Sequence, residues 1–136
     1  MEKSKLVKAL LVVAGMSGIV IGAALLFNPV AFEASAGISL GKENINMLSE
    51  VRAPGGALLA AGVLILLGAF ISKLTHTSVV LASLFYLSYG FSRILSMVVD
   101  GVPTTSLVLA TVVEIIIGLF SIYILLNFRK QQQSTV

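Results

Sequence analysis

The sequence contains no cysteine and a single histidine. Without cysteine the chain has no disulfide framework, no thiol nucleophile and no thiolate metal site. One histidine also argues against a conventional zinc site, because such sites combine several histidine and cysteine ligands. We therefore expect neither a metal ion nor a cofactor.

Charge is also scarce. Charged residues make up 11% of the 136 residues and hydrophobic residues 57%, against about 25% and roughly 45–50% in soluble domains. A chain of this length cannot bury so much apolar surface inside itself, because a small fold leaves much of its surface exposed. Uncharged runs cover residues 9–32 and 53–72, each close to the ~20 residues that a helix needs to cross a bilayer. The sequence therefore predicts a membrane protein.

The hydrophobic pattern predicts an all-α polytopic membrane protein, with four transmembrane helices in one bundle. The expected spans are residues 5–27, 53–74, 77–99 and 103–128, joined by a long first loop at 28–52. Asn28-Pro29 follows the first span, and Asp100-Gly101-Val102-Pro103 separates the last two. Such residues end or start helices. We expect the whole chain, residues 1–136, to form this single domain.

Basic residues near the spans are unevenly distributed. Lys42 and Arg52 lie on the side of the first loop, whereas six basic residues lie on the other side: Lys3, Lys5, Lys8, Lys73, Arg129 and Lys130. The positive-inside rule then places both termini in the cytoplasm. The basic balance indicates orientation rather than nucleic-acid binding, because aromatic and basic residues are not interleaved. Membrane lipids are the expected partners.

Two features of the N-terminal half have alternative interpretations. The early lysines, the apolar run and Ala34-Ser35-Ala36 resemble a secretory signal, but the run exceeds the usual 7–15-residue signal core, so we expect the first span to be retained. Residues 43–51 alternate polar and apolar positions. They are compatible with a short amphipathic helix that caps the bundle, or with an interfacial lead-in to the second span that bends at Pro54.

Small residues recur at helical spacing on the first two spans. Ala14, Gly18 and Gly22 are four residues apart on the first, and the second has Gly55, Ala57, Ala61, Gly62 and Ala69. Helices in lipid associate through close packing at such residues. We expect the contacts to lie within the chain, although a homo-oligomer or a partner in a membrane complex would use the same faces.

Glu114 is the most costly residue of the fourth span. It lies about 15 Å into that helix, and a central charge costs about 2.5–3.5 kcal/mol on insertion scales. It is therefore expected to face the bundle interior, together with a stripe of small and polar neighbours: Ala110, Thr111, Gly118 and Ser121.

Arg93 is the second costly residue, roughly 10 Å inside the end of the third span. It shares one helix face with Tyr86, Tyr89, Ser96 and Asp100, at steps of three and four residues. We therefore expect an outward-opening polar pocket lined by Arg52, Tyr86, Tyr89, Arg93, Asp100 and Glu114. The alternative is an Arg93–Glu114 bridge that only fixes the register of the last two helices.

Several short motifs occur in order along the chain. A proline follows the first span, and Arg52-Ala53-Pro54-Gly55-Gly56 starts the second. Arg93 lies in the third and is followed by Asp100-Gly101-x-Pro103, and Glu114 lies in the fourth. This pattern resembles a family of small bacterial inner-membrane proteins that carries a domain-of-unknown-function label and, more distantly, the DoxX-like four-helix proteins. The resemblance implies a bacterial inner (plasma) membrane location and no established reaction.

Three functions are compatible with these features. The first is a non-enzymatic module whose pocket binds a small anion, a lipid headgroup or a proton-coupled solute, because two arginines contribute to it. The second is a structural or accessory subunit of a membrane complex. The third is a lipid-modifying enzyme with Glu114 or Asp100 as acid or base; it ranks last because the sequence specifies no reaction, and we assign no catalytic residue.

Overall fold

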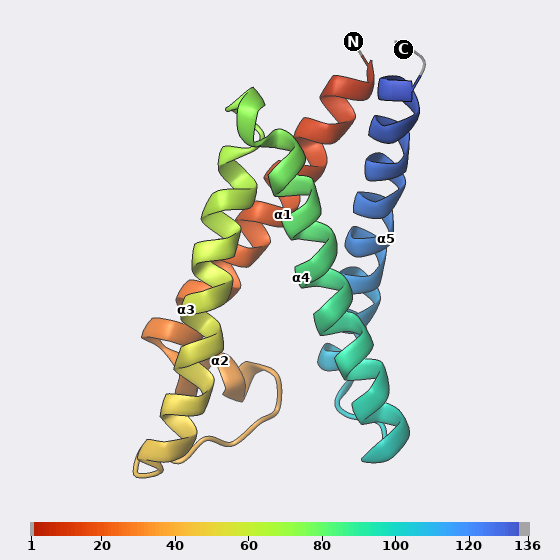
Figure 1. Cartoon of the computed structure of the whole chain (residues 1–136). Coiled ribbons are helices and arrows are strands. Elements are labelled where there is room, and N and C mark those ends of the chain that lie inside the picture. The colour runs from red at the N-terminus through yellow and green to blue at the C-terminus, as the bar shows by residue number, and fades with distance from the viewer. Residues whose placement is uncertain (1, 134–136) are drawn as a thin grey trace.

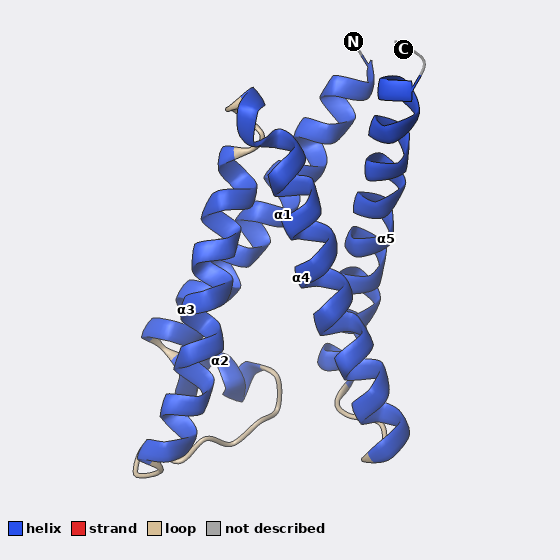
Figure 2. Cartoon of the chain, in the orientation of Figure 1, coloured by secondary structure: helices blue, strands red, loops and turns tan. Residues whose placement is uncertain are grey.

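A computed structural model describes the backbone of residues 2–133 and the side chains of residues 4–128. The chain forms five helices, α1 (Glu2–Phe27), α2 (Pro29–Ser35), α3 (Ile45–Leu67), α4 (Ser72–Val99) and α5 (Thr105–Gln133). Figure 2 shows that helices and loops account for all of this described part. Three of the basic residues that predict the orientation, Lys3, Arg129 and Lys130, have side chains outside this described range.

Four of the helices, α1, α3, α4 and α5, are long and apolar enough to cross a membrane. The shortest of them, α3, has 23 residues and is about 35 Å long at 1.5 Å per residue, which exceeds the ~30 Å of a bilayer core. Large apolar side chains are exposed along all four, including Val20, Val63, Leu84 and Ile116. Lipid is the solvent that suits such a surface, and the predicted all-α fold with four long apolar candidate spans is confirmed.

The second span differs from its prediction at both ends. Helix α3 begins at Ile45 rather than at 53, so most of the amphipathic segment 43–51 forms its first turns. The Asn44 side chain caps it by accepting a 3.1 Å hydrogen bond from the Met47 amide. Pro54 lies on an exposed face inside the helix and is tolerated there, as prolines are in membrane helices.

Helix α3 ends at Leu67, seven residues earlier than expected. The first turns of α4 satisfy its terminal carbonyls, because Ser78 donates a 2.8 Å hydrogen bond to the Leu64 carbonyl and Thr75 donates one of 2.8 Å to that of Gly68. The chain therefore reverses at residues 68–71, and Lys73 and His76 belong to α4 rather than to a turn.

The helices form two pairs, α1 with α3 and α4 with α5. Figure 1 shows that the pairs lie close together where the chain begins and ends, and diverge toward the opposite end. We call these the termini end, which includes the turn at residues 68–71, and the loop end, which includes α2, residues 36–44 and the turn at residues 100–104.

Glycines allow α1 and α3 to approach closely. A Cβ atom on Gly62 would lie 2.6 Å from the Ile19 amide nitrogen, and one on Gly55 would lie 2.7 Å from the Leu25 Cβ. Both distances are shorter than van der Waals contact, so these positions accept only glycine. The predicted glycines at 18, 22, 55 and 62 therefore pack within the chain, whereas Ala57 of the same predicted set is exposed.

The apolar core lies in the half of the molecule nearer the termini end. It joins the two helix pairs through buried residues of all four spans, namely Leu10, Leu11, Ala14, Ile65, Val79, Ala82, Tyr86, Ile117 and Ile124. Arg93 and Glu114, the charged residues inside the last two spans, lie beyond this core, toward the loop end.

A connection at the loop end also joins the two pairs. Thr104, before α5, donates a 2.9 Å hydrogen bond to the Ala36 carbonyl, and Leu40 is buried. Gly37 turns the chain beside Thr104 with φ of +83°, a conformation that favours glycine. The short helix α2 was not predicted, although Asn28-Pro29 is also a helix-start signal.

Candidate functional site

Arg93 of α4 and Glu114 of α5 form the ion pair that joins the two helices. The Arg93 Nε atom lies 3.2 Å from Oε2 and 3.3 Å from Oε1 of Glu114. The side chains are 34% and 15% exposed, respectively. They lie about 9 Å and about 13 Å from the nearer ends of their helices at 1.5 Å per residue. Both charges are thus well inside the candidate membrane spans.

The ion pair uses one nitrogen of the guanidinium. Nε donates to Oε1, whereas the buried Oε2 lies within ion-pair distance but makes no hydrogen bond to any described residue. A bidentate arginine–carboxylate pair would use two donors. Within residues 4–128, the Nη1 and Nη2 atoms of Arg93 have no hydrogen-bond acceptor. Arg93 therefore keeps most of its donor capacity.

The face of α5 around Glu114 is turned toward α4, as the sequence predicted. Thr111, Gly118 and Ser121 are buried, and Gly118 meets Leu87 of α4. The two hydroxyl groups donate to carbonyls of their own helix, four residues earlier. Their hydrogen-bonding needs are therefore met within α5. Glu114 is the charged residue of this face.

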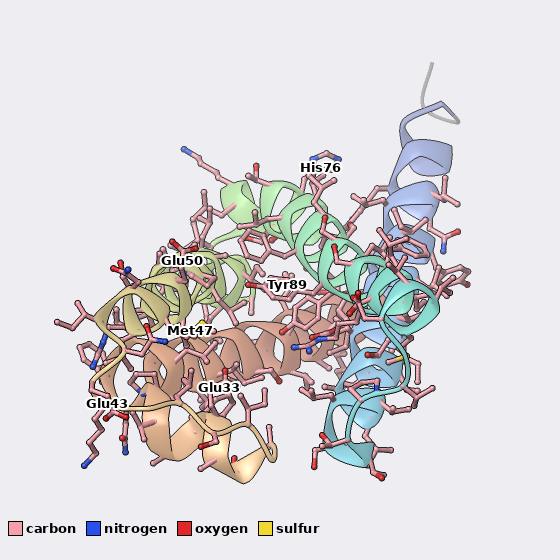
Figure 3. The ribbon with its side chains drawn as sticks, turned by 90° about the horizontal axis from the view of Figure 1, so that it is seen from below. Glu33, Glu43, Met47, Glu50, His76 and Tyr89 are labelled. Atoms are coloured by element: carbon pink, nitrogen blue, oxygen red, sulfur yellow. The ribbon has the colours of Figure 1, made fainter. Side chains whose placement is uncertain are left out.

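The two tyrosines predicted to line the pocket lie in different surroundings. Tyr86 is 8% exposed and belongs to the core, where its hydroxyl donates a 2.6 Å hydrogen bond to the Ala14 carbonyl of α1. Tyr89 is half-buried and stacks on Phe85, with ring centroids 6.2 Å apart. In Figure 3, which looks onto the loop end, Tyr89 lies near the middle of the view. Tyr89, unlike Tyr86, is not part of the apolar core.

Arg52 and Asp100 are exposed and lie away from the ion pair. Arg52 donates a hydrogen bond through Nη1 to the Leu26 carbonyl at the end of α1. Asp100 accepts a 2.9 Å hydrogen bond from Ser96. Among the described side chains, neither forms an ion pair with Arg93 or Glu114. The structure thus brings together two of the six predicted residues and leaves two at the rim.

Two cavities occur elsewhere in the fold. One of about 650 Å³ lies at the loop end between α1 and α3, where Arg52 lines it with Leu26 and Leu48. The other, of about 420 Å³, lies at the termini end and is lined by Lys8, Phe70 and Asn127. In the described part of the chain, neither cavity is lined by Arg93 or Glu114. The sequence interpretation missed the cavity at the termini end, although Lys8, about one turn into the first span, was a signal for it.

The chemistry available at the ion pair is limited to two groups. Arg93 offers hydrogen-bond donors and a permanent positive charge, and Glu114 is a carboxyl group that gains or loses a proton. Across residues 4–128, no three histidine, aspartate or glutamate side chains lie close enough together to hold a metal ion. The two groups present can donate hydrogen bonds to an anion and exchange a proton.

Comparison with known proteins gives one match. No curated protein and no solved structure matches the chain. A family model described as a domain of unknown function, DUF4345, matches residues 6–125, which include all four candidate membrane spans almost completely. The chain therefore belongs to the DUF4345 family, a group of proteins defined by a domain of unknown function.

Proposed function

We propose that this protein binds a small oxyanion at Arg93, inside the membrane, and that Glu114 takes up a proton when the anion binds. The observation that carries the proposal is the single-nitrogen contact between the two side chains, which leaves Nη1 and Nη2 of Arg93 without an acceptor among the described residues. A guanidinium is a planar fork of donors that fits carboxylate and phosphate groups. The preferred ligand therefore has at least two acceptor oxygens.

The uptake of a proton by Glu114 is inferred from the balance of charge at the site. Arg93 and Glu114 are neutral as a pair, and an uncompensated charge within a membrane is costly. A bound monoanion would leave the site with a net charge of −1. Protonation of Glu114 restores neutrality, so one proton enters with each monoanion. This coupling makes the site suitable for transport of a weak acid as well as for binding.

The ligand comes from one of two sources, a soluble oxyanion or the phosphate of a lipid headgroup. Arg93 is 34% exposed and lies about 9 Å from the end of α4, within reach of a lipid headgroup at the membrane surface. Both sources offer the same group to the guanidinium. Their affinities, measured separately, distinguish them.

The proposed orientation places the termini end in the cytoplasm and the loop end outside a bacterial inner membrane. The charge distribution supports it, because Lys5, Lys8 and Lys73 lie toward the termini end and Lys42 and Arg52 toward the loop end. The bacterial location and the distant likeness to DoxX-like proteins rest on the sequence motifs. In this orientation Arg93 receives its ligand from the outer side.

Binding measurements on purified protein test the proposed function. Inorganic phosphate is titrated into protein in detergent by calorimetry, and phosphatidylglycerol is titrated separately in mixed micelles. Arg93→Gln is expected to lower the affinity about tenfold or more, since a hydrogen bond to a charged group contributes about 1.5–3 kcal/mol. Glu114→Gln should raise the affinity and abolish proton uptake, because the competing carboxylate charge is gone.

The control is Lys42→Gln, which removes an exposed positive charge of the loop end and should leave both affinities unchanged. Binding of phosphatidylglycerol that Arg93→Gln weakens, without phosphate binding, identifies a lipid headgroup as the ligand of Arg93, and binding of phosphate that Arg93→Gln weakens identifies a soluble anion. Equal affinities of wild type and Arg93→Gln for both probes would overturn the proposal and leave the ion pair as a device that fixes helix register.

A further inference from the structure

The cavity at the termini end is separate from the proposed anion site. Its walls come from the start of α1 at residues 4–8, the turn and first residues of α4 at 68–75, and the end of α5 at 123–128. Thr75, which lines it, is 18 residues from Arg93 on α4, or about 27 Å at 1.5 Å per residue. The two places are therefore too far apart to share one small ligand.

The cavity opens toward the surface that faces lipid. Phe70 and Tyr123 line it and are 66% and 57% exposed. Leu6, from α1, lines it as well and is 45% exposed. The volume of about 420 Å³ lies within the usual range for binding sites of small molecules. An occupant with an apolar portion would therefore continue from the cavity into the bilayer.

Lys8 gives the cavity its charge. Its Nζ atom lies 4.9 Å from the centre of the Phe70 ring, at the distance of a cation–π interaction. It forms no ion pair with a described carboxylate, and none of the described residues that line the cavity is acidic. Lys8 is exposed and lies about one turn inside the candidate span Ser4–Phe27, close enough to the helix end for its ammonium group to reach the membrane interface. Its positive charge is therefore available to a negatively charged ligand at that level.

Two uncharged polar side chains line the same cavity as Lys8. Asn127 and Ser72 line it, and their side chains make no hydrogen bond to any described residue. They come from α5 and α4, whereas Lys8 comes from α1, so the three polar groups approach from different walls. Together they provide one positive charge and additional donors in a cavity whose other polar lining residues are Ser4, Thr75 and Tyr123.

We infer that this cavity binds an anionic phospholipid, with its phosphate at Lys8 and its acyl chains along Phe70 and Tyr123. The positive charge and the lack of lining carboxylates favour an anion, and the exposed apolar walls favour one that carries acyl chains. Basic pockets between membrane helices on the cytoplasmic side bind such headgroups. The inferred lipid lies between α1 and α5 and adds contacts where these helices are separated by the cavity.

Lipid-selective quenching of a single tryptophan tests this inference. The sequence has no tryptophan, so Tyr123→Trp places one fluorophore in the cavity wall. Phe70→Trp is a second reporter that preserves the cation–π contact, because tryptophan is the best aromatic partner. Each is reconstituted in phosphatidylcholine vesicles that contain doxyl-labelled phosphatidylglycerol or doxyl-labelled phosphatidylcholine. A matched reporter for ordinary boundary lipid is Leu109→Trp, since Leu109 is 60% exposed and lies near the loop end.

The two cavity reporters should prefer phosphatidylglycerol over phosphatidylcholine by about fivefold, the effect expected of one basic residue next to an anionic lipid. Leu109→Trp should show no comparable preference. Adding Lys8→Gln should reduce the preference to that of Leu109→Trp, whereas Lys8→Arg and Lys42→Gln should retain it. Equal quenching by the two lipids in both reporters, or a preference that survives Lys8→Gln, would overturn the inference.

Discussion

The Tyr86 hydroxyl donates a 2.6 Å hydrogen bond to the backbone carbonyl of Ala14. It joins α4 to α1 at a point where both residues are buried in the core. The Ala14 carbonyl also serves as an acceptor within α1, as helical carbonyls do. The bond therefore connects the two helix pairs without leaving the carbonyl dependent on it.

Tyr86→Phe is expected to reduce the free energy of unfolding by about 1 kcal/mol, since side-chain hydrogen bonds between membrane helices contribute about 0.6 kcal/mol on average and up to about 1.7. Unfolding in sodium dodecyl sulfate measures this change. The matched control is Tyr123→Phe, at an exposed position, which should be nearly neutral. A neutral Tyr86→Phe would show that the hydroxyl adds nothing to the association of α4 with α1.

Gly62→Ala should destabilise the fold strongly. The added Cβ would lie 2.6 Å from the Ile19 amide nitrogen and 2.8 Å from the Gly18 carbonyl carbon, which are backbone atoms and cannot move without separating α1 from α3. We expect a loss of at least the 1–3 kcal/mol that is typical of overpacking.

Gly56→Ala is the control on the same helix, because a Cβ there would meet only Leu26 Cδ1, at 3.9 Å. It should stabilise α3 by up to about 1 kcal/mol through higher helix propensity. Unfolding of both variants under the same conditions provides the comparison. Equal effects of the two substitutions would contradict the close packing of α1 and α3.

Much of the fold could be predicted because each span must satisfy its own backbone in lipid. Hydropathy therefore located four helices. The ends of α3 could not be predicted in the same way, because they depend on contacts with other segments. The Ser78 hydroxyl reaches the Leu64 carbonyl only after α4 has folded back, and Pro54, which suggests a bend, is accommodated within the helix.

The part of the candidate site that could be predicted consists of residues whose charge is costly in a membrane. Arg93 and Glu114 are expensive in a membrane, and the structure pairs them. Helix periodicity also placed Tyr86 on the same face as Tyr89, but three residues along a helix correspond to a rise of about 4.5 Å. That rise takes Tyr86 into the core beside α1. Sequence spacing therefore defined the face but not which neighbouring helix each residue meets.

A double-mutant cycle should show favourable coupling between Arg93 and Glu114. Each single substitution, Arg93→Gln or Glu114→Gln, destabilises the protein, because Arg93→Gln leaves a carboxylate without its partner and Glu114→Gln leaves a guanidinium. The double variant should lose less than the sum, with a coupling energy of about 0.5–3 kcal/mol. Denaturant unfolding of the four proteins measures it. Additive effects would show that the 3.2 Å contact contributes no stability.

Thr104→Val should loosen the connection at the loop end. The substitution removes the 2.9 Å hydrogen bond to the Ala36 carbonyl while preserving the shape of the side chain. That bond is exposed, so global stability should fall by no more than about 1 kcal/mol. The local effect should be larger, and trypsin should cleave faster after Lys42, an exposed loop residue. The adjacent Thr105→Val is the control and should leave cleavage unchanged.

Single cysteines determine the orientation of the protein directly, because the sequence contains none. Lys42→Cys and Lys73→Cys place thiols at exposed positions at the loop end and the termini end. If the termini end is cytoplasmic, a membrane-impermeant maleimide should label Lys42→Cys in intact cells and Lys73→Cys only after permeabilisation. The cysteine-free parent gives the background. The opposite labelling pattern would reverse the orientation, and Arg93 would then receive its anion from the cytoplasm.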